Sequence, residues 1–219
     1  MKLKLPLLLL TLTFITYAYG QSGFPFDNEI REFKHQDSLN FPKPNGILFI
    51  GSSSIRIWSD LQERFPDAPI IRRGIGGSEI AQLVNYYTPY VLFPYHPRKI
   101  FIYDGENDIA IGKSGAFVAE EFAKLWDMIR QKLPDAEVYY LSIKPSPSRI
   151  KYLSEMTDGN NRIKTFLSNK PKGHYVDLSS VIYKKGTSLP DSSLFRADYL
   201  HLNSKGYDKW QKVLQPYVN

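Results

Sequence analysis

Apolar residues in this chain occur in short runs, separated by segments in which they recur every three or four residues. The runs are Gly46–Ile50, Pro69–Ile71, Lys99–Tyr103, Glu137–Ile143 and His174–Ser179. Short runs rich in β-branched and aromatic side chains are typical of buried strands, and the longer spacing is typical of an amphipathic helix face. The helical segments are Ile55 to Phe65, Glu79 to Leu92, Val118 to Ile129, Ile150 to Phe166, and Ser204 to Leu214, with Ser204 as a helix cap.

Five alternations of strand and helix predict a particular fold class. Parallel neighbours in a sheet need a crossover connection, and a helix usually provides it. We therefore expect an α/β protein, a three-layer α/β/α sandwich with a five-stranded parallel, flavodoxin-like sheet. Ligands of such sheets bind at the carboxyl ends of the strands, so the loops after each strand are the place to look for chemistry.

Residues 1–20 follow a different pattern from the rest of the chain. A basic start, "MKLK", precedes the apolar run "LPLLLLTLTFITYAY", and small residues stand at Ala18 and Gly20. This is the pattern of a secretory signal peptide, with cleavage expected after Gly20. A retained membrane anchor is disfavoured because the run is shorter than the ~20 apolar residues that a span needs. We expect a secreted or periplasmic protein, with an N-terminal arm over residues 21–44 that holds one short helix, and one domain over residues 45–219.

Charge and composition exclude several classes of function. The net charge is +6, but the basic residues are scattered, with no run longer than a pair such as Arg72–Arg73. This pattern indicates a solvated surface, and we expect no nucleic-acid partner and no stable membrane insertion after signal cleavage. The chain has no cysteine, and its four histidines lack the spacing of metal ligands. We expect no metal and no cofactor.

Four loops at the predicted carboxyl ends carry residue types that are useful for acyl transfer. They are "GSSS" after the first strand, "RGIGGS" after the second, "GEND" after the third and "DYLH" just before the last helix. Each is a weak signal alone, since a glycine pair usually makes a tight turn and Asn107 tolerates unusual backbone angles. Their conjunction at one sheet edge is difficult to obtain by chance.

These motifs resemble those of the SGNH hydrolases, also called GDSL-type esterases and lipases, and the resemblance extends from about Gly46 to Val218. It implies that Ser53 is the nucleophile, that Asp198 and His201 complete a catalytic triad, and that Ser53, Gly77 and Asn107 form the oxyanion hole. The sequence departs from the family pattern at Ser52, where the name motif has aspartate.

The chemistry of these residue types supports the same roles. A serine hydroxyl needs a neutral imidazole to take its proton, and a carboxylate on the far ring nitrogen fixes the tautomer. The developing oxyanion needs preorganised donors, which the Ser53 and Gly77 amides and the Asn107 side chain can supply.

Several neighbours of the motifs are candidates for supporting roles. We expect Ser54 to cap the following helix and Ser52 to support the turn. Asp108 either orients the Asn107 amide or faces water as a turn residue. Tyr103 and Lys144 are candidates for substrate binding or support, and the "KPSPSR" loop that begins at Lys144 either borders the substrate site or only starts the next helix.

The resemblance implies a carboxylic ester hydrolase that acts on a small-molecule or glycan ester, with acetyl or short acyl groups on carbohydrate as the favoured substrate. A lysophospholipase or lipase-like activity on longer chains is the first alternative. A carbohydrate-binding module that kept the fold without catalysis is the second, and a nucleotide-binding flavodoxin-like domain is disfavoured because no complete phosphate-loop motif is present.

Overall fold

The computed structural model describes residues 26–218, and the predicted signal peptide and its cleavage site lie outside the described residues. Five parallel strands form one sheet in the order β2-β1-β3-β4-β5. The strands are β1 (Ile47–Gly51), β2 (Ile70–Gly74), β3 (Lys99–Tyr103), β4 (Glu137–Leu141) and β5 (Gly173–Val176). This strand order is the flavodoxin-like one, and the predicted fold class is confirmed.

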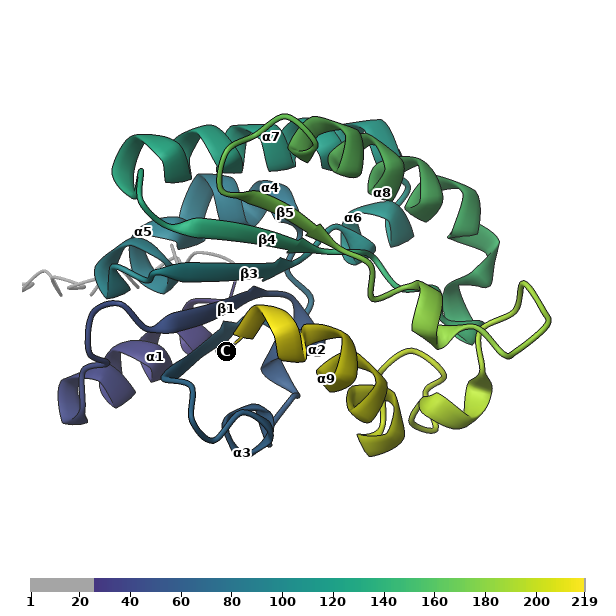
Figure 1. Ribbon diagram of the computed structural model, residues 1–219, viewed down its shortest axis with the longest axis horizontal. Helices are drawn as coiled ribbons and strands as arrows, with labels where there is room; N and C mark the ends of the chain where they lie inside the picture. The colour runs from purple at the N-terminus through teal and green to yellow at the C-terminus, as the bar shows by residue number, and fades with distance from the viewer. Residues whose placement is uncertain (1–25, 219) are drawn as a thin grey trace, which may run out of the picture.

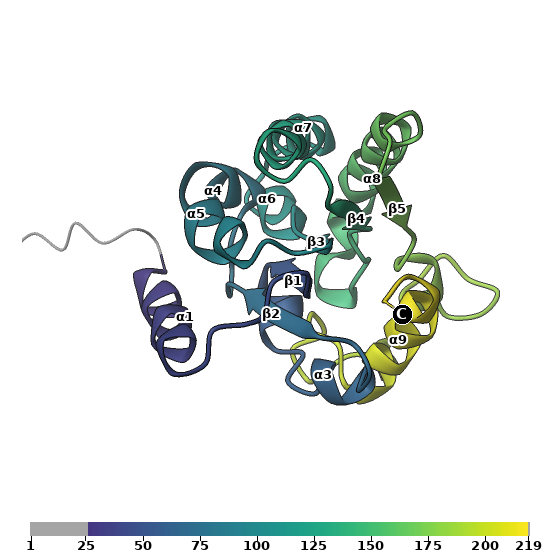
Figure 2. The ribbon, with the colours of Figure 1, turned by 60° about the vertical axis from the view of Figure 1, so that its left-hand side comes forward.

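Helices cover both faces of the sheet, as Figures 1 and 2 show, and make a three-layer sandwich. One face packs against α1 (Asp27–Leu39), α4 (Ile80–Gln82), α5 (Thr88–Val91), α6 (Glu106–Ala110), α7 (Gly115–Lys132) and α8 (Leu153–Leu167). The other face packs against α2 (Ser53–Arg56), α3 (Leu61–Arg64) and α9 (Ser204–Val218). The central strands β1, β3 and β4 are buried on both faces at almost every position, which explains why their runs in the sequence are continuous rather than alternating.

A row of stacked rings crosses the sheet on the α9 side. Phe49, Phe101, Tyr139 and His174 occupy matching positions on β1, β3, β4 and β5, and their ring centroids are 4.5, 4.5 and 4.4 Å apart in that order. Such pairs between neighbouring strands stabilise a sheet and oppose a slip in register, because a slip would separate every ring from its neighbour.

The helical segments are less regular than their periodicity predicts. Residues 55–65 lie in two short helices, α2 and α3, with a break near Ser59 and Asp60, and both serine and aspartate have low helix propensity. A π-helical turn, Leu83–Tyr87, interrupts residues 79–92 just before Pro89, which lacks an amide hydrogen and displaces the carbonyl of the preceding turn. The short helix expected in the N-terminal arm is present as α1, with thirteen residues.

Two further details differ from the sequence prediction. The sequence does not predict the α6 helix, because five residues are too few to show a helical period. The predicted cap of α9, Ser204, is wrong: the Asn203 side chain accepts a hydrogen bond from the Gly206 amide at 3.2 Å, while Ser204 is the first residue of the helix. Among the described residues, no helix combines the length and apolar character needed to cross a membrane.

The close approach of β1 to β3 requires glycine at position 51. Gly51 has a φ of +124°, and a Cβ at this position would lie 1.9 Å from the carbonyl oxygen of Tyr103. Gly186 also has a positive φ, of +77°, but a Cβ there would contact nothing within 4 Å. The pair therefore separates the cost of backbone strain from the cost of the close approach.

We expect Gly51→Ala to lower the free energy of unfolding by about 2–4 kcal/mol, because it adds a clash to the strained backbone. Gly186→Ala should cost only about 1 kcal/mol, from strain alone. Urea unfolding of both variants measures the difference, and equal losses would contradict the clash.

Candidate active site

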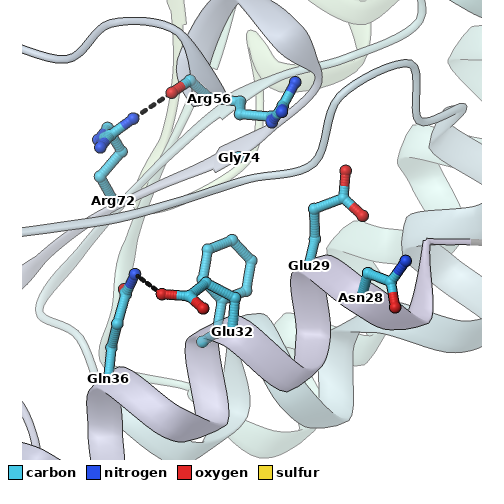
Figure 3. Close-up of a pocket in the computed structure, with 8 residues that line it drawn as sticks. Asn28, Glu29, Glu32, Gln36, Arg56, Arg72 and Gly74 are labelled. Atoms are coloured by element: carbon cyan, nitrogen blue, oxygen red, sulfur yellow. Dashed lines mark hydrogen bonds between the residues drawn. The ribbon is translucent and has the colours of Figure 1, made fainter.

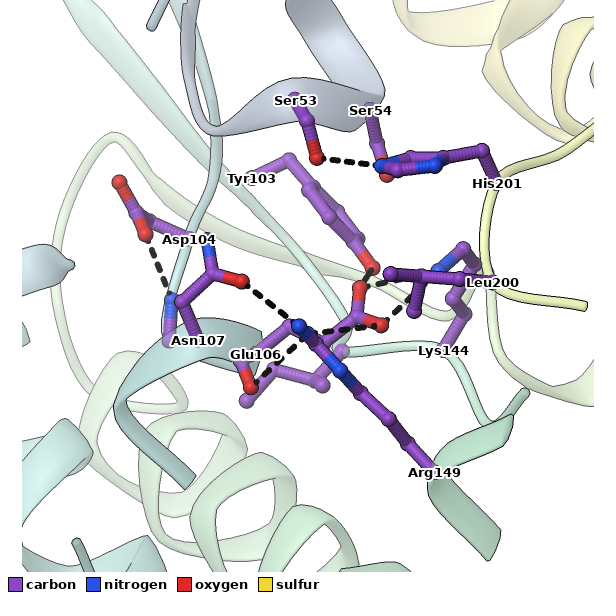
Figure 4. A network of polar contacts seen from close by, with 12 residues as sticks. Ser53, Ser54, Tyr103, Asp104, Glu106, Asn107, Lys144, Arg149, Leu200 and His201 are labelled. Carbon is purple, nitrogen blue, oxygen red and sulfur yellow. Dashed lines mark hydrogen bonds and ion pairs between the residues drawn. The ribbon is translucent and has the colours of Figure 1, made fainter. Parts of the chain in front are cut away.

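Ser53, His201 and Asp198 form a continuous chain of hydrogen bonds at the carboxyl edge of the sheet. Ser53 Oγ lies 2.9 Å from His201 Nε2, and His201 Nδ1 lies 2.6 Å from Asp198 Oδ2. Figure 4 shows the serine at the start of α2 and the histidine on the loop before α9, which the fold brings to the same place. The structure thus brings together the three residues that the sequence predicts as a triad.

The protonation of this chain follows from Asp198. Burial raises the pKa of its carboxyl. The hydrogen bonds with the His201 ring and from the His201 and Leu200 amides have the larger, opposite effect, and the pKa falls to about 2. An ionised carboxylate only accepts hydrogen bonds, so the neutral imidazole carries its proton on Nδ1 and presents Nε2 as an acceptor. The Ser53 hydroxyl then donates to Nε2, which is the direction of proton transfer that a nucleophilic serine requires.

The end of β1 determines where Ser53 lies. The Ser52 amide donates to the Tyr103 carbonyl at 2.9 Å, and α2 begins at Ser53. As the first residue of a helix, Ser53 has an amide without an intrahelical acceptor, and no other acceptor in residues 26–218 pairs with it. Ser52 is buried and precedes α2, but its side chain makes no capping hydrogen bond. The predicted cap, Ser54, is wrong, because Ser54 is buried inside the helix.

Gly77 and Asn107, the two other predicted oxyanion-hole residues, are joined through Ser78. Gly77 is exposed, has a φ of +80°, and its amide has no hydrogen-bond acceptor within the described part of the chain. Asn107 Nδ2 donates to the Ser78 carbonyl at 2.8 Å. The amide nitrogen of asparagine carries two hydrogens, so one remains available. The loop after β2 and the helix after β3 are therefore fixed relative to each other.

The orientation of the Asn107 amide is also fixed from its oxygen side. Arg149 Nη2 donates to Asn107 Oδ1 at 3.0 Å, so the amide cannot rotate by half a turn without losing both hydrogen bonds. The prediction that Asp108 orients Asn107 is wrong. Asp108 points the other way, and its Oδ2 accepts a hydrogen bond from the Ile80 amide at 3.0 Å. It is completely buried and does not face water either.

A buried charge cluster lies beneath Asn107 and includes both Tyr103 and Lys144 (Figure 4). Lys144 Nζ contacts the Glu106 carboxylate at 2.9 and 3.1 Å, and the Tyr103 hydroxyl donates to the same carboxylate at 2.5 Å. Arg149 Nη1 lies 3.4 Å from Glu106 Oε1. Tyr103 and Lys144 have no exposed surface, so they are placed to support the site rather than to touch a ligand.

The cluster is charge-compensated, as a buried carboxylate requires. Burial raises the pKa of Glu106, but the positive charges of Lys144 and Arg149 and the Tyr103 hydrogen bond leave it lower than usual. Burial lowers the pKa of Lys144, and Glu106 offsets that effect only in part. One carboxylate thus faces two cations, and the excess positive charge lies on Arg149, next to Asn107.

Sequence reasoning missed three of these residues: Ser78, Glu106 and Arg149. Glu106 lies inside the "GEND" motif and Arg149 ends the "KPSPSR" segment, but neither motif indicates a role for them. Their partners lie far away along the chain, and no periodicity reports such contacts. The structure favours the interpretation in which the "KPSPSR" segment borders the site. Residues 147–152 also form the 3₁₀ turn that leads into α8.

The described residues contain no group of three or more histidine and acidic side chains placed to share a metal ion. The groups present at this edge are a hydroxyl, an imidazole, a carboxylate and several N–H donors. This set matches acyl transfer, in which a serine attacks a carbonyl and donors stabilise the oxyanion.

The family model described as GDSL-like lipase/acylhydrolase matches residues 51–209, which include all five predicted site residues with Ser53 near its beginning and His201 near its end. The chain belongs to the GDSL-like lipase/acylhydrolase family. The resemblance inferred from the four motifs is thereby confirmed. No curated protein matches the sequence of this GDSL-like protein.

Solved structures share the fold of this GDSL-like protein at low sequence identity. A Streptococcus pneumonia protein provisionally described as a platelet activating factor is 23% identical, with a TM-score of 0.77 over 89% of this chain and 92% of that one. A GDSL-like lipase from Bacteroides thetaiotaomicron is 16% identical, with a TM-score of 0.73 over 86% and 96%. A family 3 carbohydrate esterase from Talaromyces cellulolyticus is 15% identical, with a TM-score of 0.61 over 78% and 95%.

Asp108 gives the site a measurable pH dependence. Burial raises its pKa to about 6, from about 4 for an ordinary aspartate. A raised pKa in the folded state favours the protonated form, so the fold loses stability as pH rises from about 4 through about 6. We expect this loss to be on the order of 2 kcal/mol, and Asp108→Asn should remove it.

Urea unfolding at several pH values between about 4 and 7 measures that slope. The exposed Asp67→Asn is the matched control and should keep the wild-type slope. An Asp108→Asn slope equal to that of the wild type would show that another group causes the pH dependence.

Proposed function

We propose that this protein is a serine esterase that removes acetyl or other short acyl groups from carbohydrate by way of an acyl-enzyme. The observation that carries the proposal is the hydrogen-bond chain from Ser53 through His201 to Asp198. The family supports ester hydrolysis in general. The neighbour from Talaromyces cellulolyticus, described as a carbohydrate esterase, supports the choice of substrate class.

The proposed mechanism uses each residue once in each half-reaction. Ser53 Oγ bonds to the ester carbonyl carbon while its proton moves to His201 Nε2, and the carbonyl oxygen becomes an oxyanion. The Ser53 and Gly77 amides and the second Asn107 Nδ2–H donate to that oxygen. The C–O bond then breaks, and the alcohol leaves with the proton from His201. Water repeats the sequence on the acyl-enzyme, which releases the acid and restores Ser53.

The signal-peptide pattern of residues 1–20 supports a further part of the proposal, that the enzyme acts outside the cytoplasm. Polysaccharide esters would then be accessible to it. Neither part depends on the other, because the ester chemistry needs only the site at the sheet edge.

Hydrolysis of p-nitrophenyl acetate, butyrate and octanoate by the mature protein tests the reaction. We expect acetate to be preferred and Ser53→Ala to reduce kcat by about 10⁴–10⁶, because the nucleophile is lost. The neighbouring Ser52→Ala is the matched control for a serine-to-alanine change and should retain most of the activity. A preference for octanoate would favour a lipase-like function, and activity that survives in Ser53→Ala would contradict the triad.

Arg149 has a defined part in this proposal as a positioning residue. Its guanidinium holds Oδ1 of Asn107, so Nδ2 faces the oxyanion, and its positive charge polarises the amide toward a stronger N–H donor. Its second contact, with Glu106, fixes the guanidinium in place. Arg149 therefore acts on the transition state through Asn107 and should leave substrate binding almost untouched.

A double-mutant cycle tests this role. Asn107→Ala should lower kcat by about 10²–10³, and Arg149→Met by about tenfold, with KM nearly constant in both. The double variant should be no slower than Asn107→Ala, because Arg149 has nothing left to position. Arg162→Met, at an exposed arginine of α8, is the control. Additive losses in the double variant would show that Arg149 acts directly on substrate.

A further inference from the structure

A polar groove of about 470 Å³ lies between α1 and the edge strand β2, and Figure 3 shows its lining. The residues that line it are Asn28, Glu29, Glu32, Phe33, Gln36, Arg56, Arg72 and Gly74. We call it the α1 groove. One wall is α1, and the other is formed by β2 together with the last residue of α2.

Both walls of the α1 groove reach the loop that carries Gly77. On the α2 side, the Arg56 guanidinium packs against Gly76, where an added Cβ would lie 2.8 Å from Arg56 Nη1. On the α1 side, Phe26 immediately precedes the helix, and its ring lies 3.7 Å from the position of a Cβ on Gly77. Arg56 also ends the four-residue helix that begins with Ser53. The groove therefore starts beside the point where the ester carbonyl would lie.

The α1 wall is held firmly against the domain, so the groove is preformed. Ile30 is buried in the core, and Asp37 near the end of the helix pairs with Arg73 and accepts a hydrogen bond from the Tyr95 hydroxyl at 2.6 Å. Arg73 Nε in turn donates to that hydroxyl at 2.7 Å. A preformed site binds with less loss of conformational entropy than one that must be ordered by the ligand.

The charged groups of the groove are of both signs, and part of their hydrogen-bonding capacity is unused. Glu29 and Glu32 on α1 lie across from Arg56 and Arg72. Arg72 is hydrogen-bonded to the Arg56 carbonyl, and Glu32 accepts from Gln36 at 2.9 Å. Within residues 26–218, the side chains of Glu29 and Arg56 form no hydrogen bond or ion pair.

This lining selects against two classes of ligand. An anion would meet the carboxylates of Glu29 and Glu32, and an apolar acyl chain would remove four charged side chains from water without giving them partners. A hydroxyl group both donates and accepts, so one hydroxyl can bond a carboxylate and its neighbour can bond a guanidinium. The half-buried ring of Phe33 offers an apolar surface for the C–H face of a sugar.

We propose that the α1 groove binds the sugar units of a neutral oligosaccharide whose acyl ester lies at Ser53. This inference rests on the proposed function for the position of the ester, and it adds that the carbohydrate is a neutral oligosaccharide and which surface recognises it. Glu29 and Arg56 are its main hydrogen-bonding groups, and the glycan chain runs from Gly76 along the edge of β2.

Binding of unacetylated xylotetraose, cellotetraose and mannotetraose to the mature protein, measured by isothermal titration calorimetry, tests the groove without requiring catalysis. At least one tetrasaccharide should bind, and Glu29→Ala and Arg56→Ala should each weaken that binding by about tenfold, the loss expected for a hydrogen bond to a charged group. Glu120→Ala, at an exposed glutamate of α7, is the matched control and should bind as the wild type does.

Kinetics on the same variants separate the groove from the reaction. The ratio of kcat/KM for acetylated xylotetraose to that for p-nitrophenyl acetate should fall by about tenfold in Glu29→Ala through a higher KM, and Glu120→Ala should keep the wild-type ratio. Ester hydrolysis with no tetrasaccharide binding, or with binding that the groove variants leave intact, would contradict glycan binding in the α1 groove but not the proposed esterase activity. Groove-dependent binding without hydrolysis of any ester would support glycan binding in the α1 groove and contradict the proposed esterase activity.

Discussion

In-register parallel pairing places Gly74, Gly51 and Tyr103 side by side at the carboxyl ends of β2, β1 and β3. Three of the five candidate site residues follow this row directly along the chain. Ser53 follows Gly51 by two residues, Gly77 follows Gly74 by three, and Asn107 follows Tyr103 by four, so their positions are set within a few bonds of the sheet. The close contact of Gly51 with the Tyr103 carbonyl fixes the row itself, because no side chain fits between the two strands.

A buried carboxylate beside this row carries a cost that the fold has to offset. Removing Glu106 and Lys144 from water costs several kcal/mol for each ion, and their mutual contact returns only part of it. An apolar pair of similar volume at these two positions would stabilise the fold as well as the ion pair does. The charged cluster instead positions the Arg149 guanidinium against Asn107. It also leaves an excess positive charge near the place where the proposed reaction develops a negative charge.

The N-terminal helix combines a structural role with the proposed recognition role. An edge strand such as β2 presents unpaired backbone groups that invite aggregation, and covering the edge is one way in which proteins prevent it. Here α1 lies beside that edge at a distance that leaves a polar groove rather than a dry contact. The same helix that protects the sheet thus provides a preformed surface next to the site.

The sequence by itself determined the parallel α/β fold and five candidate site residues, Ser53, Gly77, Asn107, Asp198 and His201. Buried strands appear as continuous apolar runs, and parallel strands end at one edge. Ser53, Gly77 and Asn107 follow those ends directly, and Asp198 and His201 form a short motif before the last helix, so local patterns were sufficient. Tertiary structure alone decided the role of Arg149, the burial of Lys144, the direction of Asp108 and the groove beside α1. These depend on partners that are tens of residues away, such as Asn107 and Arg149, which are 42 positions apart. Periodicity tells which face of an element is buried, but not which side chain of another element lies opposite.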